Sequence, residues 1–201
     1  MSKLPAEFYY RQDVVSIARE LIGKFVFSNI DGHISGGMIV ETEAYRGPDD
    51  RGSHAYNGRR TPRNEIMYAR GGLVYMYICY GIHDMFNIVT AGEGTSHAIL
   101  IRAIQPVEGL DIMRERRGIY DQDWRLCQGP GALAKALGLA IIHNGTDLTG
   151  NEIWLEDRKT VIDPVNIMAS ARVGMNFEGP YKTIPWRFYV KGSRFVSRPH
   201  L

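Results

Sequence analysis

The amino-acid sequence predicts a single mixed α/β domain of the α+β type, residues 1–201, with a largely antiparallel curved sheet, surrounding helices and a protruding β-hairpin. Its 201 residues, 44% of them hydrophobic and 23% charged, fit one globular domain. Most of the predicted strands follow one another across short turns, and helical segments lie between them, which is the pattern of a mixed domain. No internal repeat, low-complexity tract or linker divides the sequence.

The first helix and the first two strands are predicted within residues 13–45. Asp13 is placed to cap the helix and Gly23 to end it. Strands are predicted at 24–28 and 36–45, joined by the turn NIDG. The helix would bury the residues that recur at helical spacing, which are Val14, Ile17, Ala18 and Leu21.

The segment 46–72 is rich in glycine, proline, asparagine and arginine and has little periodicity. An irregular stretch of this length inside a compact domain is usually functional or disordered. Its basic residues, against the single acid Glu65 in 51–70, are Arg51, Arg59, Arg60, Arg63 and Arg70. Such a cluster is a candidate contact for a polyanion, whereas the basic run at 114–117 is predicted to be a solvated helix face.

The most strand-like segment is LVYMYICY at 73–80. It is followed by MFNIVTAG at 85–92 across the short stretch GIHD, and the two predict the hairpin. The remaining predicted elements are strands at 97–106, 151–157 and 186–193 and helices at 107–118 and 129–139.

Composition narrows the classes of function. The two cysteines, Cys79 and Cys127, form no C-x-x-C pair, so we expect buried thiols in a reducing compartment and no metal site. Because the N-terminus lacks the apolar core of a signal peptide and no segment reaches transmembrane length, we expect an intracellular protein without membrane contact. A net charge of +2 is weak evidence for a polyanion partner.

The stretch MIVETEAY, residues 38–45, places two carboxylates at the end of an apolar run. In a strand Glu41, Glu43 and Tyr45 share one face. Either one glutamate lies at the rim of the core and serves as a general base, or both are solvated acids on an edge strand. The pattern alone leaves the two readings open.

Aromatic residues suggest a slot for a planar ligand. Tyr45, His54 and Tyr77 are candidates for its walls, although a structural role for a single histidine is common. Asn87 is a candidate for reading a base edge. Tyr80, followed by Gly81 at the hairpin tip, is better placed as an exposed wedge than as a core residue.

These residues recur in one order, as ETEAYRGPDD, SH, GRRTPRN, LVYMYICYG, ILIRAIQPVEG, ARVG and RFYVKGS. From about Leu4 to its C-terminus the chain resembles the alkyladenine (3-methyladenine, methylpurine) DNA glycosylase family, and we expect a bacterial member. The resemblance implies a monomeric repair enzyme that flips alkylated or deaminated purines out of duplex DNA and hydrolyses the N-glycosidic bond, leaving an abasic site. It also implies monofunctional chemistry without lyase activity or cofactor, in the cytoplasm at the nucleoid.

The resemblance assigns roles to individual residues. Glu43 resembles the general base that activates a water molecule, and Arg102 and the carbonyl of Val173 resemble that water's other ligands. A nearby arginine would also keep the glutamate ionised. Glu41 is left with a structural or salt-bridging role.

By the same resemblance, the flipped base stacks between Tyr45 and His54 on one side and Tyr77 on the other. Asn87 resembles the residue that excludes purines with a 2-amino group. The expected DNA contacts are the wedge residues Tyr80, Gly81 and Ile82 and the backbone-positioning residues Arg59, Thr61 and Arg63. The turn also brings His83 and Asp84 near the DNA, where Asp84 must turn away from phosphates.

Two other functions fit parts of the pattern. A carbohydrate glycosidase would use Glu41 and Glu43 as its carboxylate pair, but side chains on one strand face cannot easily flank a sugar from opposite sides. A non-catalytic lesion-binding module would need the basic and aromatic residues without Glu43 or Arg102.

Overall fold

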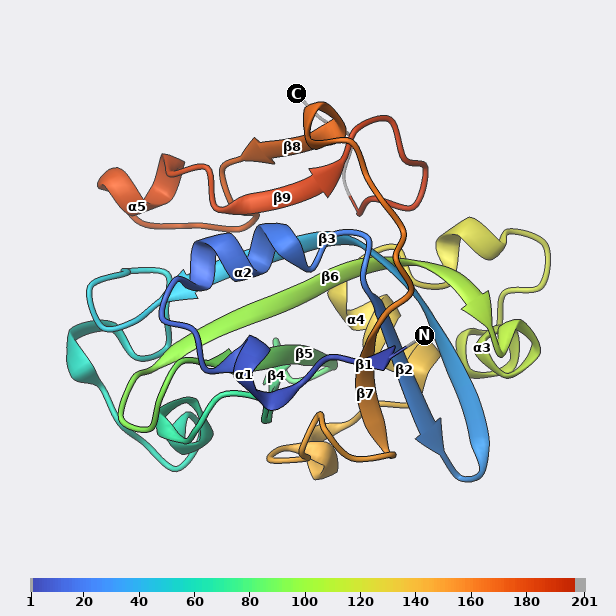
Figure 1. Cartoon of the computed structure of the whole chain (residues 1–201), viewed down its shortest axis with the longest axis horizontal. Coiled ribbons are helices and arrows are strands. Elements are labelled where there is room, and N and C mark those ends of the chain that lie inside the picture. The colour runs from blue at the N-terminus through green and yellow to red at the C-terminus, as the bar shows by residue number, and fades with distance from the viewer. Residues whose placement is uncertain (1, 198–201) are drawn as a thin grey trace.

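The computed structural model describes residues 2–197, so Met1 and residues 198–201, the ends of the predicted domain, lie outside the described residues. It confirms the predicted fold class, because the described chain forms one nine-stranded antiparallel sheet with helices around it (Figure 1). The sheet follows the order β1-β7-β2-β3-β6-β5-β4, and β9 and then β8 are added beside β3.

The strands are β1 (Ser2–Lys3), β2 (Phe25–Ile30), β3 (His33–Arg46), β4 (Val74–Cys79), β5 (His83–Thr90), β6 (His97–Glu108), β7 (Ile153–Asp157), β8 (Ile167–Ser170) and β9 (Arg187–Val190). The α-helices are α1 (Ala6–Tyr9), α2 (Val14–Glu20), α3 (Leu110–Arg117), α4 (Pro130–Leu137) and α5 (Pro180–Thr183). The segment 46–72 forms two short 3₁₀ helices, Tyr56–Gly58 and Glu65–Tyr68, and otherwise turns.

β3 is the central strand of the fold. Its first half pairs with β2, nearly its whole length pairs with β6, and residues 41–43 pair with β9. Glu41, Thr42 and Glu43 therefore have a neighbouring strand on each side, and all three are completely buried. This position excludes the solvated edge strand that the sequence left open.

Two β-bulges bend the sheet beside these residues. Val40 on β3 and Arg102 on β6 are each left without a partner in the pairing between the two strands. A bulge bends its strand and redirects a side chain. Arg102 consequently reaches Glu41 and Glu43, which lie on one face of β3.

Helices cover the sheet and complete the core. Asp13 caps α2 as predicted, because its Oδ1 accepts hydrogen bonds from the N–H groups of Val15 and Ser16. α2 lies in front of β3 and β6 in Figure 1, and Thr42 on the opposite face from the glutamates donates to the Ala18 carbonyl. α4 packs on β5 and β6.

Several predicted boundaries are wrong. The hairpin turn is Tyr80–Ile82, so His83 and Asp84 belong to β5 and not to the turn. Strand β6 continues to Glu108 because it pairs with the start of β3, and α3 begins after Gly109, whose φ is 70°. β1, β8, α1 and α5 were not predicted, since elements of two to four residues carry no periodic pattern.

Candidate active site

A cavity of about 350 Å³ opens beside the β4–β5 hairpin. Its walls come from the end of β3, the segment 46–72, the hairpin, β6 and the loop at 173–175. The predicted site residues that line it are Tyr45, His54, Tyr77, Tyr80, Asn87, Arg102 and Val173. The fold thus brings together residues that lie up to 128 positions apart in the sequence, from Tyr45 to Val173.

Glu43 lies directly behind the wall of this cavity and is completely buried. Its Oε1 accepts a hydrogen bond from the N–H of Val173 at 2.7 Å, and its Oε2 accepts one from the hydroxyl of Tyr45 at 2.8 Å. Nη1 of Arg102 lies 3.4 Å from Oε2. Three residues that face the cavity therefore hold the carboxylate in place, and Val173 does so through its N–H. The predicted contact of the Val173 carbonyl with a water molecule stays a prediction.

Glu41 is the second buried carboxylate and does not line the cavity. Its Oε1 accepts hydrogen bonds from Nε of Arg102 at 2.9 Å, Nε of Arg187 at 2.8 Å and the hydroxyl of Ser197 at 2.9 Å. Burial alone would raise the pKa of Glu41, but the two guanidinium groups and the Ser197 hydrogen bonds lower it below its usual value. Glu41 is therefore an ionised anchor for Arg102, in agreement with its predicted structural role.

His54, Tyr75 and Tyr77 form the aromatic part of the wall. The His54 ring meets Tyr77 edge to face with ring centroids 4.6 Å apart, which leaves no room for a third ring between them. The predicted placement of His54 across a slot from Tyr77 is therefore not the arrangement in this structure. Tyr45 supplies the separate aromatic surface of the cavity.

The His54 ring is neutral and is hydrogen-bonded to Tyr75. Burial, with the nearby charges of Arg63 and Arg59, lowers the pKa of His54 to about 4, and burial raises the pKa of Tyr75 to about 12. The Tyr75 hydroxyl lies 2.7 Å from Nδ1 of His54, so a hydrogen bond joins the two uncharged side chains.

This depressed pKa predicts a pH-dependent stability. The unfolded chain binds a proton at His54 near pH 6.5, whereas the folded chain binds it only near pH 4. The contribution of the neutral His54 to the free energy of unfolding is therefore present above pH 6.5 and is lost as the pH falls towards 4. Between pH 7 and pH 5 the free energy of unfolding should fall by about 2 kcal/mol more in the wild type than in His54→Gln. Urea unfolding of both proteins at the two pH values measures this difference. An equal fall of the free energy of unfolding in the two proteins would contradict a neutral, buried His54.

Asn87 is held rigidly at the cavity wall. Its Nδ2 donates to the carbonyls of Tyr75 at 3.1 Å and Met85 at 3.2 Å, which fixes the orientation of the amide. A side chain that cannot swing aside can exclude a substituent on a bound ring. The geometry suits the selective role that the resemblance implies.

The hairpin tip presents Tyr80, whose side chain is 88% exposed. Tyr80 has φ 51° and Gly81 has φ 74°, two successive positive values that match the twist of a hairpin turn. A left-handed conformation costs a tyrosine about 1–3 kcal/mol, and such strain is concentrated at functional positions. Ile82 beside it is also exposed.

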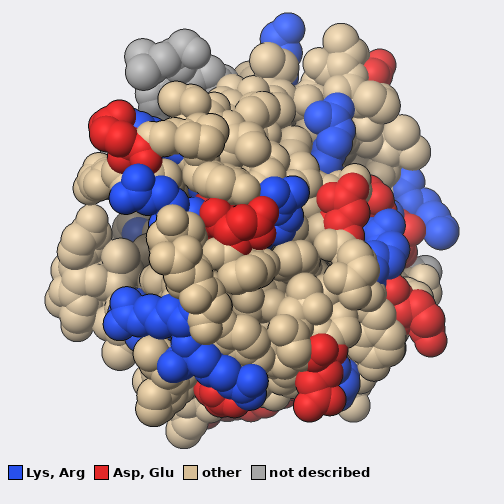
Figure 2. Space-filling view, turned by 90° about the vertical axis from the view of Figure 1, so that its left-hand side faces the viewer, with Lys and Arg blue, Asp and Glu red and all other residues tan. Residues whose placement is uncertain are grey.

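The arginines of the segment 46–72 divide into two groups. Arg60 pairs with Glu65, Arg70 pairs with Asp147, and Arg51 donates to the Glu178 carbonyl. Figure 2 views the side of the molecule on which this segment lies and shows basic and acidic side chains next to each other. The predicted basic cluster is therefore partly neutralised.

Arg59, Thr61 and Arg63 line a smaller cavity of about 270 Å³ next to the first one. The Thr61 hydroxyl donates to Asn64, and Arg63 lies 5.2 Å from the centroid of the Tyr77 ring. Within residues 2–197 no ion pair involves Arg59 or Arg63, so both charges remain available to a ligand.

Asp84 and His83 lie on the other side of the hairpin tip. Asp84 is half-buried, and its buried Oδ1 has no hydrogen-bond partner among the described residues. One oxygen of the Asp84 carboxylate is therefore shielded from solvent, and its orientation towards DNA stays a prediction.

Two parts of the site were not predicted. Tyr75 is the partner of His54, and its position two residues before Tyr77 on a strand was the available signal. Arg172, beside Val173, forms a buried pair with Asp50, and no short-range sequence pattern links those positions.

Residues 2–197 contain no group of three or more histidine, cysteine or acidic side chains arranged to hold a metal ion. Over the same residues, no helix has both the length and the apolar character needed to cross a membrane.

Comparison with known proteins gives a consistent result. The family model of methylpurine-DNA glycosylase (MPG) matches residues 7–194. A Chlamydia felis protein named "Putative 3-methyladenine DNA glycosylase" is 44% identical over 188 residues, which cover 93% of this chain and 95% of the relative. Proteins of the same name from Desulfitobacterium hafniense and Bacillus licheniformis are each 41% identical, over 98% and 97% of this chain and 99% and 96% of their own lengths.

Proposed function

The chain belongs to the methylpurine-DNA glycosylase family, and from this membership and the site geometry we propose that it hydrolyses the N-glycosidic bond of damaged purines that it flips out of duplex DNA. The observation that carries the proposal is the buried Glu43 carboxylate directly behind an aromatic cavity, held by three residues of the cavity wall. A cavity of about 350 Å³ is within the range of small-ligand sites.

In the proposed reaction Glu43 takes a proton from a water molecule as the water oxygen bonds to the anomeric carbon. The N-glycosidic bond breaks, and its electron pair leaves with the base. The negative charge of Glu43 also stabilises the oxocarbenium-like charge on the sugar. Arg102 and Val173 orient the carboxylate, and Glu41 holds Arg102 from behind.

Base recognition is assigned to the aromatic wall and Asn87. The flipped purine stacks on Tyr45 and Tyr77, and the fixed amide of Asn87 excludes a 2-amino substituent. Alkylated purines that carry a positive charge are good leaving groups and stack well on electron-rich rings. Deaminated purines such as hypoxanthine, which carry no positive charge, are the second proposed class of substrate.

We also propose that the enzyme has no lyase activity. A lyase needs an amine nucleophile to form a Schiff base with the sugar. Of the described residues that line the cavity, none is a lysine.

A duplex that holds one 3-methyladenine or one hypoxanthine tests the proposal. Incubation with the protein should create an abasic site, scored as strand scission after alkali treatment and not before it. Binding to the lesion without scission would favour the non-catalytic module. Scission before alkali would overturn the absence of lyase activity.

The wedge role of Tyr80 predicts a defect in capture. Tyr80→Ser should raise the enzyme concentration needed for half-maximal single-turnover cleavage by about 5- to 100-fold, the range of one stacking contact. The rate at saturating enzyme should change much less, because Tyr80 does not touch Glu43 in the described structure.

Tyr120→Ser is the matched control, because Tyr120 is 71% exposed and does not line the cavity. Equal affinity of the wild type for lesion-containing and undamaged duplexes would argue against a wedge. So would identical titrations of the Tyr80 and Tyr120 variants.

A further inference from the structure

Arg172 is a buried cation at the junction of three segments that line the cavity. Its Nη1 donates to the Ala44 carbonyl at 2.9 Å and to Oδ2 of Asp50 at 2.6 Å. Its Nη2 donates to Oδ1 of Asp50 at 2.7 Å and to the Tyr181 carbonyl at 3.1 Å. Both charged side chains of the Arg172–Asp50 pair are completely buried.

We propose that Arg172, held by Asp50, is a positioning residue that fixes Tyr45 and the Val173 N–H around Glu43. This inference rests on the proposed function, since it concerns the same cavity. Arg172 does not line that cavity, whereas Tyr45 and Val173 both do. It therefore acts on the site from behind the wall.

The contact with Tyr45 is direct. The Arg172 guanidinium lies 4.6 Å from the centroid of the Tyr45 ring, within the range of a cation–π interaction. Since Tyr45 faces the cavity and Arg172 does not, the cation covers the ring face that a base cannot reach. Tyr45 in turn donates its hydroxyl to Glu43.

The contact with Val173 passes through the backbone. Arg172 immediately precedes Val173, whose N–H donates to Oε1 of Glu43. Four hydrogen bonds fix the Arg172 side chain and limit movement of the next peptide group. Arg172 thus supports two of the three donors that hold the carboxylate.

Asp50 connects this arrangement to the segment that carries His54. Its carboxylate also accepts the N–H of Arg46 at 3.1 Å and that of Gly52 at 2.8 Å. A Cβ on Gly52 would lie 2.8 Å from Nη2 of Arg172, so the chain approaches the guanidinium as closely as glycine allows. Gly52 itself lines the cavity.

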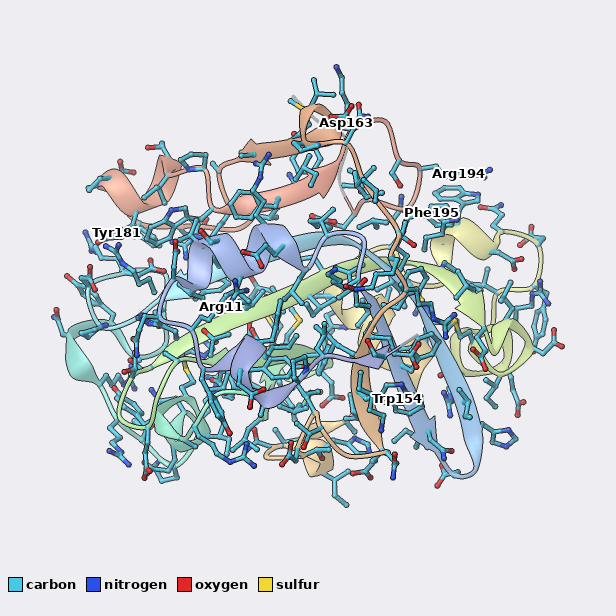
Figure 3. All side chains as sticks on the ribbon, viewed as in Figure 1. Arg11, Trp154, Asp163, Tyr181, Arg194 and Phe195 are labelled. Atoms are coloured by element: carbon cyan, nitrogen blue, oxygen red, sulfur yellow. The ribbon has the colours of Figure 1, made fainter. Side chains whose placement is uncertain are left out.

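Tyr181 adds a fourth segment. Figure 3 shows its side chain extending from α5 towards the end of the sheet, where its hydroxyl lies 3.0 Å from Asp49 and 3.2 Å from Arg46. The Trp186 ring lies 5.6 Å from both Arg172 and the Tyr181 ring.

Stability alone does not account for such a pair. Replacing a buried ion pair by apolar residues is often neutral for stability or improves it, because both ions lose their hydration. Arg172 also leaves its Nε buried without a hydrogen-bond partner among residues 2–197, which adds a cost. The planar fork of arginine instead suits simultaneous contacts in fixed directions.

Arg172→Met tests the proposal with two readouts. Amide hydrogen exchange of Val173, measured by NMR without DNA, should become at least about tenfold faster, because its hydrogen bond is no longer held. Single-turnover cleavage of a lesion-containing duplex at saturating enzyme should fall by about 10- to 100-fold, the effect of a misplacement of about 1 Å.

Arg114→Met is the matched control. Arg114 makes a two-pronged contact with Asp123 as well, at 2.9 and 2.7 Å but partly exposed, and does not line the cavity. It should leave both readouts at wild-type values. Arg172→Lys keeps the charge but not the planar fork, so its exchange and cleavage rates should lie between those of the wild type and Arg172→Met. If the methionine variant does not fold, the lysine variant alone tests the proposal.

The outcomes separate the two proposals. Wild-type Val173 exchange in a folded Arg172 variant overturns the positioning role, as does cleavage equal to that of Arg114→Met. If the wild type cleaves no damaged duplex, the proposed function fails, and the exchange measurement still decides whether Arg172 holds the wall.

Discussion

Glu43→Gln will lower the single-turnover rate of base release by about 10²- to 10⁴-fold, the usual contribution of a general base. Glutamine has the shape of glutamate but can neither accept a proton at neutral pH nor stabilise a growing positive charge. Its amide oxygen can still accept the Val173 N–H, and Arg102 keeps its contact with Glu41. The variant should therefore fold and bind lesion-containing DNA with affinity close to that of the wild type.

The measurement is alkali-dependent scission of a duplex with one damaged purine, together with a binding titration of the same duplex. Glu178→Gln is the control, because Glu178 is an exposed acid paired with Lys182 and does not line the cavity. Normal cleavage by Glu43→Gln would remove Glu43 from the mechanism and require another group to activate the water.

Glu41→Ala is expected to have the largest effect on stability, about 3–5 kcal/mol of the free energy of unfolding. The change removes the carboxylate that Arg102 and Arg187 share inside the sheet and the acceptor of the Ser197 N–H. Because the pKa of Glu41 is lowered in the folded state, its stabilising contribution is present at neutral pH and is lost as the pH falls through that lowered value.

Glu20→Ala provides the comparison. Glu20 also pairs with an arginine, Arg11 at 2.8 Å, but both side chains are more than 40% exposed. Such surface pairs contribute at most about 1 kcal/mol. Urea unfolding at pH 7 should separate the two variants clearly; similar losses would mean that the buried carboxylate is not the anchor of Arg102.

Strand alternation was sufficient to predict one face for Glu41, Glu43 and Tyr45, and the structure agrees. Alternation could not predict the bulge at Arg102, because a bulge depends on the register between two paired strands. Here the strands are β3 and β6, and Glu43 and Arg102 are 59 residues apart in the sequence. The family resemblance supplied Arg102 where periodicity could not.

Other errors have the same origin in long-range structure. GIHD looks like a turn, but His83 pairs with Cys79, and two positive φ values at Tyr80 and Gly81 shorten the turn to three residues. β8 becomes a strand only because β9 lies beside it. The Arg172–Asp50 contact joins positions 122 residues apart, and two charged residues at such a separation leave no signal in one sequence.

The double pairing of β3 has a consequence for how such an enzyme can change. Glu43 stands on the strand with hydrogen-bonded neighbours on both edges, whereas Tyr80, His54 and Arg59 stand on a turn and in an irregular segment. Segments without ladder hydrogen bonds open more readily and tolerate substitution better than the interior of a sheet. If Glu43 is the proposed general base, variation in these segments can alter which bases bind and how DNA is contacted while the carboxylate stays in place, so that new substrates need no new chemistry.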